Sequence, residues 1–304
     1  MMHKYLISGL RVSSEMILPG AIPEDSQGEC FDVSVRRAEV PVDLDSASVR
    51  GATWEIGRDR CLVRVPRLAR FLIVAGRDIT VQFESNATDH DVAGFVLGSA
   101  FGILLHQRHA LVLHGAAVAR DGRALVICGE SGAGKSTLAA ALCSEGYAFL
   151  ADDICVIGLD SEKRPVVLPD GRQLKLWRAS IDHLDLATRR GDAVRNSFEK
   201  YYIEPAAIRA APTPLAAIFV LREARPPLQE GIEKAALPDA MRMLEQEAYQ
   251  PALRARMGVK STQLAQSAAL FAHAAAFRLI RPRGLDHLPK TMAMIRDHGD
   301  LGGR

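Results

Sequence analysis

The feature that most constrains the fold is a glycine-rich octapeptide, GESGAGKS, at residues 129–136. An apolar run, RALVIC (123–128), precedes it, and a helix-forming run, KSTLAAAL (135–142), overlaps its end. The pattern G-x-x-x-x-G-K-S between a strand and a helix predicts a tight turn whose backbone needs glycine. Such a turn points successive N–H groups inward and ends at a helix N-terminus, and both features favour phosphate. The octapeptide therefore predicts an α/β fold with a phosphate-binding loop.

Each residue type in the octapeptide suits the binding of a nucleoside triphosphate. Lys135 can reach the β- and γ-phosphates, the Ser136 hydroxyl can coordinate Mg²⁺, and Thr137 is expected to assist at the helix start. The flanking strand and helix argue against a chance match in a glycine-rich loop. The predicted nucleotide-binding residues are Gly129, Glu130, Ser131, Gly132, Ala133, Gly134, Lys135, Ser136 and Thr137.

An acidic pair follows at a short distance along the chain. Asp152 and Asp153 come sixteen and seventeen residues after Ser136, at the end of the apolar run YAFLA. Two adjacent carboxylates at a half-buried strand end are costly unless a cation or a proton compensates them. Bound Mg²⁺ with nucleotide would supply the cation. We expect Asp153 to bind the metal with Ser136 and Asp152 to accept a hydroxyl proton, and the alternative is a solvated pair of aspartates.

A histidine and several missing motifs narrow the function. His114, in LVLHGAAVA, lies fifteen residues before Gly129, on a strand expected beside the strand of the loop. A lone histidine in an apolar strand is more often a residue of the core than a catalytic one. The sequence has no NKxD, LSGGQ, HRD or DFG motif. GTPases, transporter ATPases and the common protein kinases are therefore disfavoured.

The chain divides by pattern into two parts. Residues 1–88 read as β-rich, and we predict a domain boundary there, with residues 89–304 forming the nucleotide-binding domain. A helix is predicted over residues 91–107. The second part alternates as α/β, with predicted strands at 110–119, 124–129, 147–159 (interrupted by the acidic pair) and 214–223, and with later helices at 239–249 and 262–277.

The composition indicates which kinds of partner and which cellular location to expect. The 38 Lys and Arg nearly balance the 36 Asp and Glu, which disfavours a nucleic-acid partner. The last 54 residues carry nine Lys and Arg against three Asp, which is typical of a solvated basic face or a surface for an acidic partner.

Five cysteines without a CxxC spacing indicate reduced thiols. The N-terminus lacks the features of a signal peptide, and the most apolar segment, 92–105, is too short to cross a bilayer. We therefore expect a cytoplasmic protein without a membrane partner.

With these residues established, residues 113–157 resemble the catalytic core of HPr kinase/phosphorylase, which has a His-Gly strand, a phosphate loop and a nearby Asp-Asp in this order. The segments YLISGLRVSSEMILP (5–19) and LKLW (174–177) resemble a divergent branch of HPr-kinase-related proteins, some from peptide-modifying clusters such as those for lasso peptides. The resemblance implies a fold shared with phosphoenolpyruvate carboxykinase and an ATP- and Mg²⁺-dependent kinase. Its substrate would be a serine of a peptide or protein, and it would form homo-oligomers. The positions that match the family's active site are His114, Lys135, Ser136, Asp152 and Asp153.

The sequence departs from that family after the acidic pair. The E-x-R-G-x-G segment is missing, and GRQLKLWRAS (171–180) stands where it is expected, which puts a reverse phosphorylase reaction in doubt. Lys175 or Arg178 would replace it as cationic contacts to phosphate, or they are surface charges. The run 189–205 is a candidate substrate loop bringing Lys200 to phosphate, or a plain connector. A small-molecule kinase and a non-catalytic ATP-binding switch remain the alternative functions.

Overall fold

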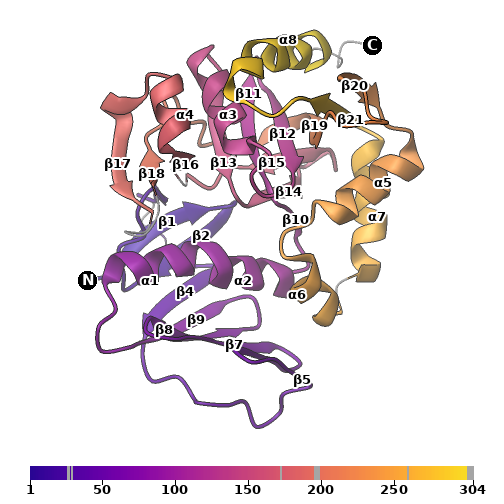
Figure 1. Ribbon diagram of the computed structural model, residues 1–304. Coiled ribbons are helices and arrows are strands. Elements are labelled where there is room, and N and C mark those ends of the chain that lie inside the picture. Colours follow the sequence, from indigo (N-terminus) through magenta and orange to yellow (C-terminus); the bar gives the residue numbers. More distant parts are fainter. Residues whose placement is uncertain (26–27, 29, 172, 195–198, 259, 300–304) are drawn as a thin grey trace. The chain divides into compact units, whose positions relative to one another are not determined.

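A computed structural model describes residues 1–25, 28, 30–171, 173–194, 199–258 and 260–299 (Figure 1). The chain groups into two compact units, Met1–Val112 with Gln250–Gln263, and Leu113–Tyr249 with Leu264–Arg304. Residues 89–112 thus group with the N-terminal strands. The boundary predicted at residue 88 is a statement about independently folding domains. This grouping does not test independent folding, so the boundary stays a prediction.

The first unit is built on a mainly antiparallel sheet, in agreement with the β-rich pattern of residues 1–88. The strand order is β3-β1-β2-β4-β9-β8-β7-β6-β5. Alternating side chains of β8 are fully buried, as expected for a strand with one face in the core. The strands are β1 (His3–Ile7), β2 (Leu10–Ser14), β3 (Ile22–Pro23), β4 (Val33–Arg37), β5 (Val49–Arg50), β6 (Trp54–Ile56), β7 (Arg60–Val65), β8 (Ala69–Val74) and β9 (Asp78–Phe83).

The helix predicted over 91–107 is confirmed, and it belongs to this unit. It consists of α1 (Asp89–Phe95), a π-helical turn (Val96–Ala100) and α2 (Phe101–Gln107). Thr88 caps it, because its hydroxyl oxygen accepts a hydrogen bond from the Asp91 backbone N–H. Residues 101–106 are all buried, which explains why this is the most apolar stretch of the chain. A short helix, α6 (Pro251–Arg256), completes the unit. Among the described residues, no helix has both the length and the hydropathy that a bilayer crossing requires.

The second unit is a mixed α/β arrangement. Its larger sheet has the order β10-β14-β15-β19-β12-β11-β13, with β21 beside β19 and β20 beside β21, and β16, β18 and β17 form a smaller sheet. The strands are β10 (Leu111–Leu113), β11 (Gly115–Arg120), β12 (Arg123–Gly129), β13 (Ala148–Asp152), β14 (Cys155–Leu159), β15 (Pro165–Leu168), β16 (Leu174–Trp177), β17 (Arg190–Ala193), β18 (Lys200–Ile203), β19 (Thr213–Glu223), β20 (Gly231–Lys234) and β21 (Ala275–Arg281). The helices are α3 (Lys135–Ser144), α4 (Arg178–His183), α5 (Leu237–Gln246), α7 (Lys260–Phe271) and α8 (Leu288–Gly299).

Strand direction places several strand ends at one edge of the larger sheet. β12 is parallel to β19, and β19 is parallel to β21. β11 is antiparallel to both β12 and β13, so β13 runs in the direction of β12. The carboxyl ends of β13, β12, β19 and β21 therefore share one edge. Helix α3 packs against this sheet over a core that includes Phe149, Phe219 and Phe277.

Three expectations about local structure need correction. The strand predicted over 110–119 is interrupted at His114, whose backbone N–H donates instead to the Glu247 carbonyl. The helix predicted over 262–277 ends at Phe271, and β21 begins at Ala275 because Phe277 and Leu279 are buried in a strand beside β19. The run 189–205 contains the paired strands β17 and β18 rather than one loop, and its residues 195–198 lie outside the described residues.

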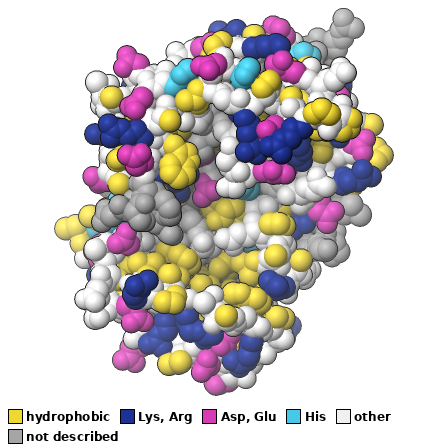
Figure 2. All heavy atoms as spheres, in the orientation of Figure 1, with side chains coloured by type: hydrophobic (Ala, Val, Ile, Leu, Met, Phe, Trp, Pro, Cys, Tyr) yellow, Lys and Arg dark blue, Asp and Glu magenta, His cyan; other side chains and the backbone are white. Residues whose placement is uncertain are grey.

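Several cations of the basic C-terminal segment form ion pairs. Arg278 pairs with Glu233 at 2.9 Å, Lys290 pairs with Glu230 at 2.7 Å, and Arg296 pairs with Glu145. On the face seen in Figure 2, Lys and Arg side chains lie interspersed with Asp and Glu side chains. This charge pattern agrees better with a solvated face than with a continuous basic surface.

Candidate functional site

The loop that joins β12 to α3 has the curled backbone that its glycines predicted. Gly129, Gly132 and Gly134 have φ of 144°, 80° and 89°, values that side chains disfavour. A Cβ on Gly129 would lie 3.1 Å from the Leu221 carbonyl oxygen, so the loop also packs closely on β19. Glycine is required here for conformation and for space.

Lys135 is held inside this loop. Its side chain is buried, and its Nζ donates to the carbonyl oxygens of Gly129 at 2.8 Å and Glu130 at 3.0 Å. Burial lowers the pKa of the Lys135 ammonium, and nearby negative groups oppose this effect. The loop therefore surrounds a cation that is fixed in position.

Asp152 lies beside the start of α3. Its Oδ1 accepts a hydrogen bond from Ser136 Oγ at 2.8 Å, and its Oδ2 accepts one from the Lys175 backbone N–H at 3.1 Å. Only 3% of the residue is exposed. Burial raises the pKa of the Asp152 carboxyl group, and the charge of Asp153 raises it further.

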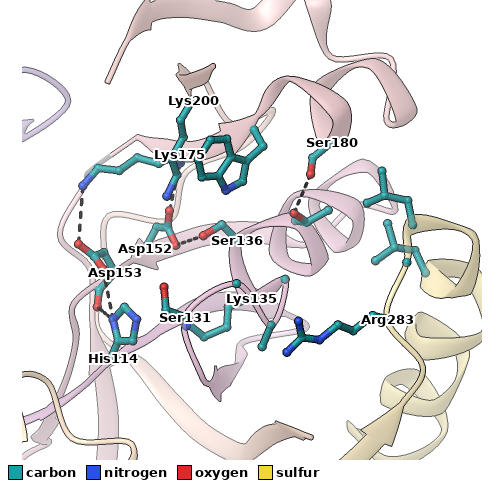
Figure 3. Close-up of a pocket in the computed structure, with 18 of the residues that line it drawn as sticks. His114, Ser131, Lys135, Ser136, Asp152, Asp153, Lys175, Ser180, Lys200 and Arg283 are labelled. Carbon is teal, nitrogen blue, oxygen red and sulfur yellow. Dashed lines mark hydrogen bonds and ion pairs between the residues drawn. The ribbon is translucent and has the colours of Figure 1, made fainter. Parts of the chain in front are cut away.

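Asp153 faces a different set of groups. Its backbone φ is 75°, in the left-handed region, because the chain turns sharply after β13. Asp153 Oδ1 lies 3.2 Å from His114 Nδ1, and Oδ2 lies 3.7 Å from Lys175 Nζ. His114 Nδ1 also lies 3.1 Å from the Asp153 carbonyl oxygen. Figure 3 shows Asp152 directed toward Ser136 and Asp153 directed toward His114.

These groups surround a cavity of about 610 Å³. Seven of the nine predicted nucleotide-binding residues line it, whereas Gly129 and Glu130 contribute the carbonyls that hold Lys135. The cationic side chains of the lining outnumber its carboxylates. The cations are Lys135, Lys175, Lys200, Arg281 and Arg283, and the carboxylates are Asp152 and Asp153.

The sequence offered Lys175 or Arg178 as a cationic contact to phosphate. In the structure, these two residues have different surroundings. Lys175 lines the cavity and approaches Asp153. Arg178 is half-exposed on α4 and approaches Asp182 at 3.7 Å. Lys200, on β18, lies over the ring of Trp177 at 5.9 Å, and both residues line the cavity.

Eight residues of the lining were not predicted from the sequence, and two of them contact the loop or the start of α3. Ser180 Oγ contacts Thr137 Oγ1 at 3.0 Å, and Arg281 Nη2 donates to the Ala133 carbonyl at 2.7 Å. Arg281 ends β21, a strand whose first residues, 275–277, were included in the helix predicted over 262–277. The signal that was available is the run AAFRLIRP, whose aromatic and branched residues before proline are typical of a strand end.

The donor set fits magnesium bound with a nucleotide. Among the described residues, no cluster of three or more His, Cys, Asp or Glu side chains is able to hold a metal ion. Ser136 and Asp152 offer adjacent oxygen donors, and Mg²⁺ commonly takes one or two protein oxygens together with phosphate oxygens and water. The expected metal pair, Ser136 and Asp153, stays a prediction, whereas the observed contact joins Ser136 to Asp152.

Comparisons with known proteins give little support for a family. No protein-family model matches the sequence, and no curated protein matches it. Among solved structures, a HPr(Ser) kinase/phosphatase from Coxiella burnetii matches with a TM-score of 0.34 and 14% identity, over 62% of this chain and 89% of that chain. We base no functional argument on a likeness of this size, so the resemblance of residues 113–157 stays a prediction.

Proposed function

We propose that this protein is an ATP-dependent kinase that transfers the γ-phosphate to a serine hydroxyl of a peptide or protein. The observation that carries the proposal is the contact between Ser136 and the buried carboxylate of Asp152, at the end of a loop that encloses Lys135. These groups open into a cavity with an excess of cations. A triphosphate requires this combination of fixed cations and inward N–H groups.

Binding of the phosphates would fall to the loop and the start of α3. The positive φ of the loop glycines gives the curled backbone of a phosphate-binding loop, and the N-terminus of the ten-residue helix α3 adds partial positive charge. Lys135 is positioned by two loop carbonyls, so little reorganisation is needed when charge develops between the β- and γ-phosphates.

Ser136 and Asp152 would hold Mg²⁺, which supplies charge neutralisation on the phosphates when it is bound. The environment of Asp152 supports this role, because a buried carboxylate with a raised pKa is stabilised by a nearby cation. This assignment reverses the order expected from the sequence, in which Asp153 was the metal ligand.

Asp153 is then the residue that takes the proton. About a third of its side chain is exposed, and His114 and Lys175 hold its two oxygens. In the proposed step, the serine oxygen forms a bond to the γ-phosphorus while the bond between that phosphorus and the β–γ bridging oxygen breaks. The serine proton passes to the Asp153 carboxylate, and ADP leaves with the electron pair. Lys175 and Lys200 would offset charge on the transferred group.

The acceptor class rests on the resemblance of residues 113–157 alone, so the experiment must identify the acceptor. We would measure transfer from γ-labelled ATP with Mg²⁺ to a panel of serine peptides. The proteins would be the wild type, Lys135→Ala, Asp152→Asn and Asp153→Asn. Asp182→Asn is the matched control, because Asp182 is an exposed carboxylate on α4 outside the cavity.

Label on a peptide in the wild type and in the control, lost in the other three variants, would support the proposal. Label on a small-molecule hydroxyl only would favour the small-molecule kinase. Tight ATP binding without transfer or hydrolysis would contradict catalysis and leave the nucleotide-dependent switch. The expected homo-oligomer is a further proposal, which light scattering would test.

A further inference from the structure

The order of strands gives the candidate site two different ends, on either side of the phosphate loop. On one side of β12 lie β11 and β13, which bring His114, Asp152 and Asp153 to the edge. On the other side lie the carboxyl ends of β19 and β21. Ligands of α/β sheets lie across the carboxyl ends of parallel strands. A nucleotide whose γ-phosphate lies near Asp152 would therefore extend toward β19 and β21.

Arg281 holds the end of β21 against the loop. Its Nη2 donates to the Ala133 carbonyl at 2.7 Å, and only 8% of the residue is exposed. A Cβ on Gly134 would lie 2.6 Å from this same nitrogen, so the contact is close. The turn that follows Arg281 is thus fixed beside the start of α3.

The surface of this turn differs in chemistry from the acidic end. Arg283, Gly284, Leu285 and Leu288 line the cavity together with Thr137. Leu285 is partly buried and packs on the core, which gives a rigid apolar surface. In Figure 3, Arg283 lies on the opposite side of Lys135 from His114 and Asp153. An apolar face beside a guanidinium group suits a base and a ribose, because a base can stack on the guanidinium plane and pack against apolar side chains.

We propose that the turn Arg283–Leu288 binds the nucleoside half of ATP, which leaves the Asp153–His114 end to the acceptor. This inference rests on the proposed function, and it adds a subsite that neither the loop motif nor the acidic pair defines. Arg283 is held at 2.7 Å by Glu223, so its guanidinium is positioned before a nucleotide arrives.

The test compares ATP with inorganic tripolyphosphate, which has the phosphates but no nucleoside. Dissociation constants with Mg²⁺ would be measured by calorimetry for Leu285→Asp and Arg283→Ala. The controls are Leu159→Asp, on the exposed part of β14, and Arg225→Ala, which removes the other guanidinium that pairs with Glu223. Neither control residue lines the cavity.

We expect Leu285→Asp to raise the Kd of ATP about tenfold and Arg283→Ala to raise it about threefold, with the Kd of tripolyphosphate unchanged within about twofold. Lys135→Ala should weaken both ligands. An unchanged ATP affinity in both turn variants would overturn the assignment, and so would an equal loss for ATP and tripolyphosphate. If circular dichroism shows that Leu285→Asp does not fold, the Kd values of Arg283→Ala for ATP and tripolyphosphate decide whether the assignment holds. A wild type that binds neither ligand overturns the proposed function and this assignment with it.

Discussion

Replacing Asp152 with Asn is expected to stabilise the protein in the absence of nucleotide. Asp152 is 3% exposed, and its pKa is raised first by burial and then by Asp153. Asn removes the charge, and both hydrogen bonds have replacements. The amide oxygen can accept from the Lys175 N–H, and the amide nitrogen can donate to Ser136 Oγ, which accepts as well as donates.

The sign of the effect and its pH dependence follow from the direction of the pKa shift. A carboxyl group whose pKa is higher in the folded than in the unfolded state destabilises the fold when it is ionised. The cost is fully present above the folded-state pKa, and it disappears as the pH falls toward the ordinary value of 3.8. Substitutions that relieve or create an incompletely compensated buried charge change the free energy of unfolding by about 1 kcal/mol or more. We therefore expect Asp152→Asn to raise the free energy of unfolding by about 1 kcal/mol near pH 7.5, and Tm by roughly 2–4 °C.

The assay is thermal unfolding with EDTA at several values between about pH 4 and pH 8, followed by the same series with Mg²⁺ and ATP. Asp182→Asn is the control, because Asp182 is an exposed carboxylate on α4 outside the cavity. Mg²⁺ with ATP should raise Tm of the wild type more than that of Asp152→Asn. The reasoning is refuted if Asp152→Asn lowers Tm near pH 7.5, or if the difference from wild type does not shrink as the pH falls.

Three further predictions concern the loop and the thiols. Gly134→Ala should destabilise the protein by about 0.5–1.5 kcal/mol more than Gly146→Ala in chemical denaturation, because both positions have positive φ but a Cβ at 134 would displace the Arg281 guanidinium from the Ala133 carbonyl. Lys135→Met should raise the Kd of ATP more than tenfold by calorimetry, because a charge-assisted contact to phosphate is lost. Native protein near pH 7.5 should take up one iodoacetamide by mass spectrometry, at the exposed Cys30, because the other four cysteines are buried.

The elements predicted best from the sequence are those whose pattern is local. The octapeptide, its strand and its helix were placed within two or three residues, because glycine conformation and hydrophobic periodicity are properties of a short segment. The helix over 91–107 was predicted for the same reason. The strand that follows His114 was expected to lie beside the strand that leads into the loop. The pairing of β11 with β12, with Gly115 opposite Cys128, confirms this expectation.

The parts that were missed depend on contacts distant in sequence. The alanines before Phe277 favour a helix locally, but the strand β21 is stabilised by its place between β19 and β20. The contact from Arg281 to Ala133 joins residues 148 positions apart, which no local pattern reveals. Which aspartate faces Ser136 depends on the turn after β13, and adjacent identical residues carry no sequence signal of that difference.

The left-handed backbone at Asp153 has a consequence for the comparison of related sequences. Glycine, asparagine and aspartate adopt this conformation at lower cost than most residues, so the turn alone favours these residue types at position 153. Position 152 ends a regular strand, and nothing in its backbone requires an acid. An aspartate retained among relatives at 153 would therefore be weaker evidence of selection for chemistry than one retained at 152. A relative with Asn or Gly at 153 would keep the turn while losing the proposed base.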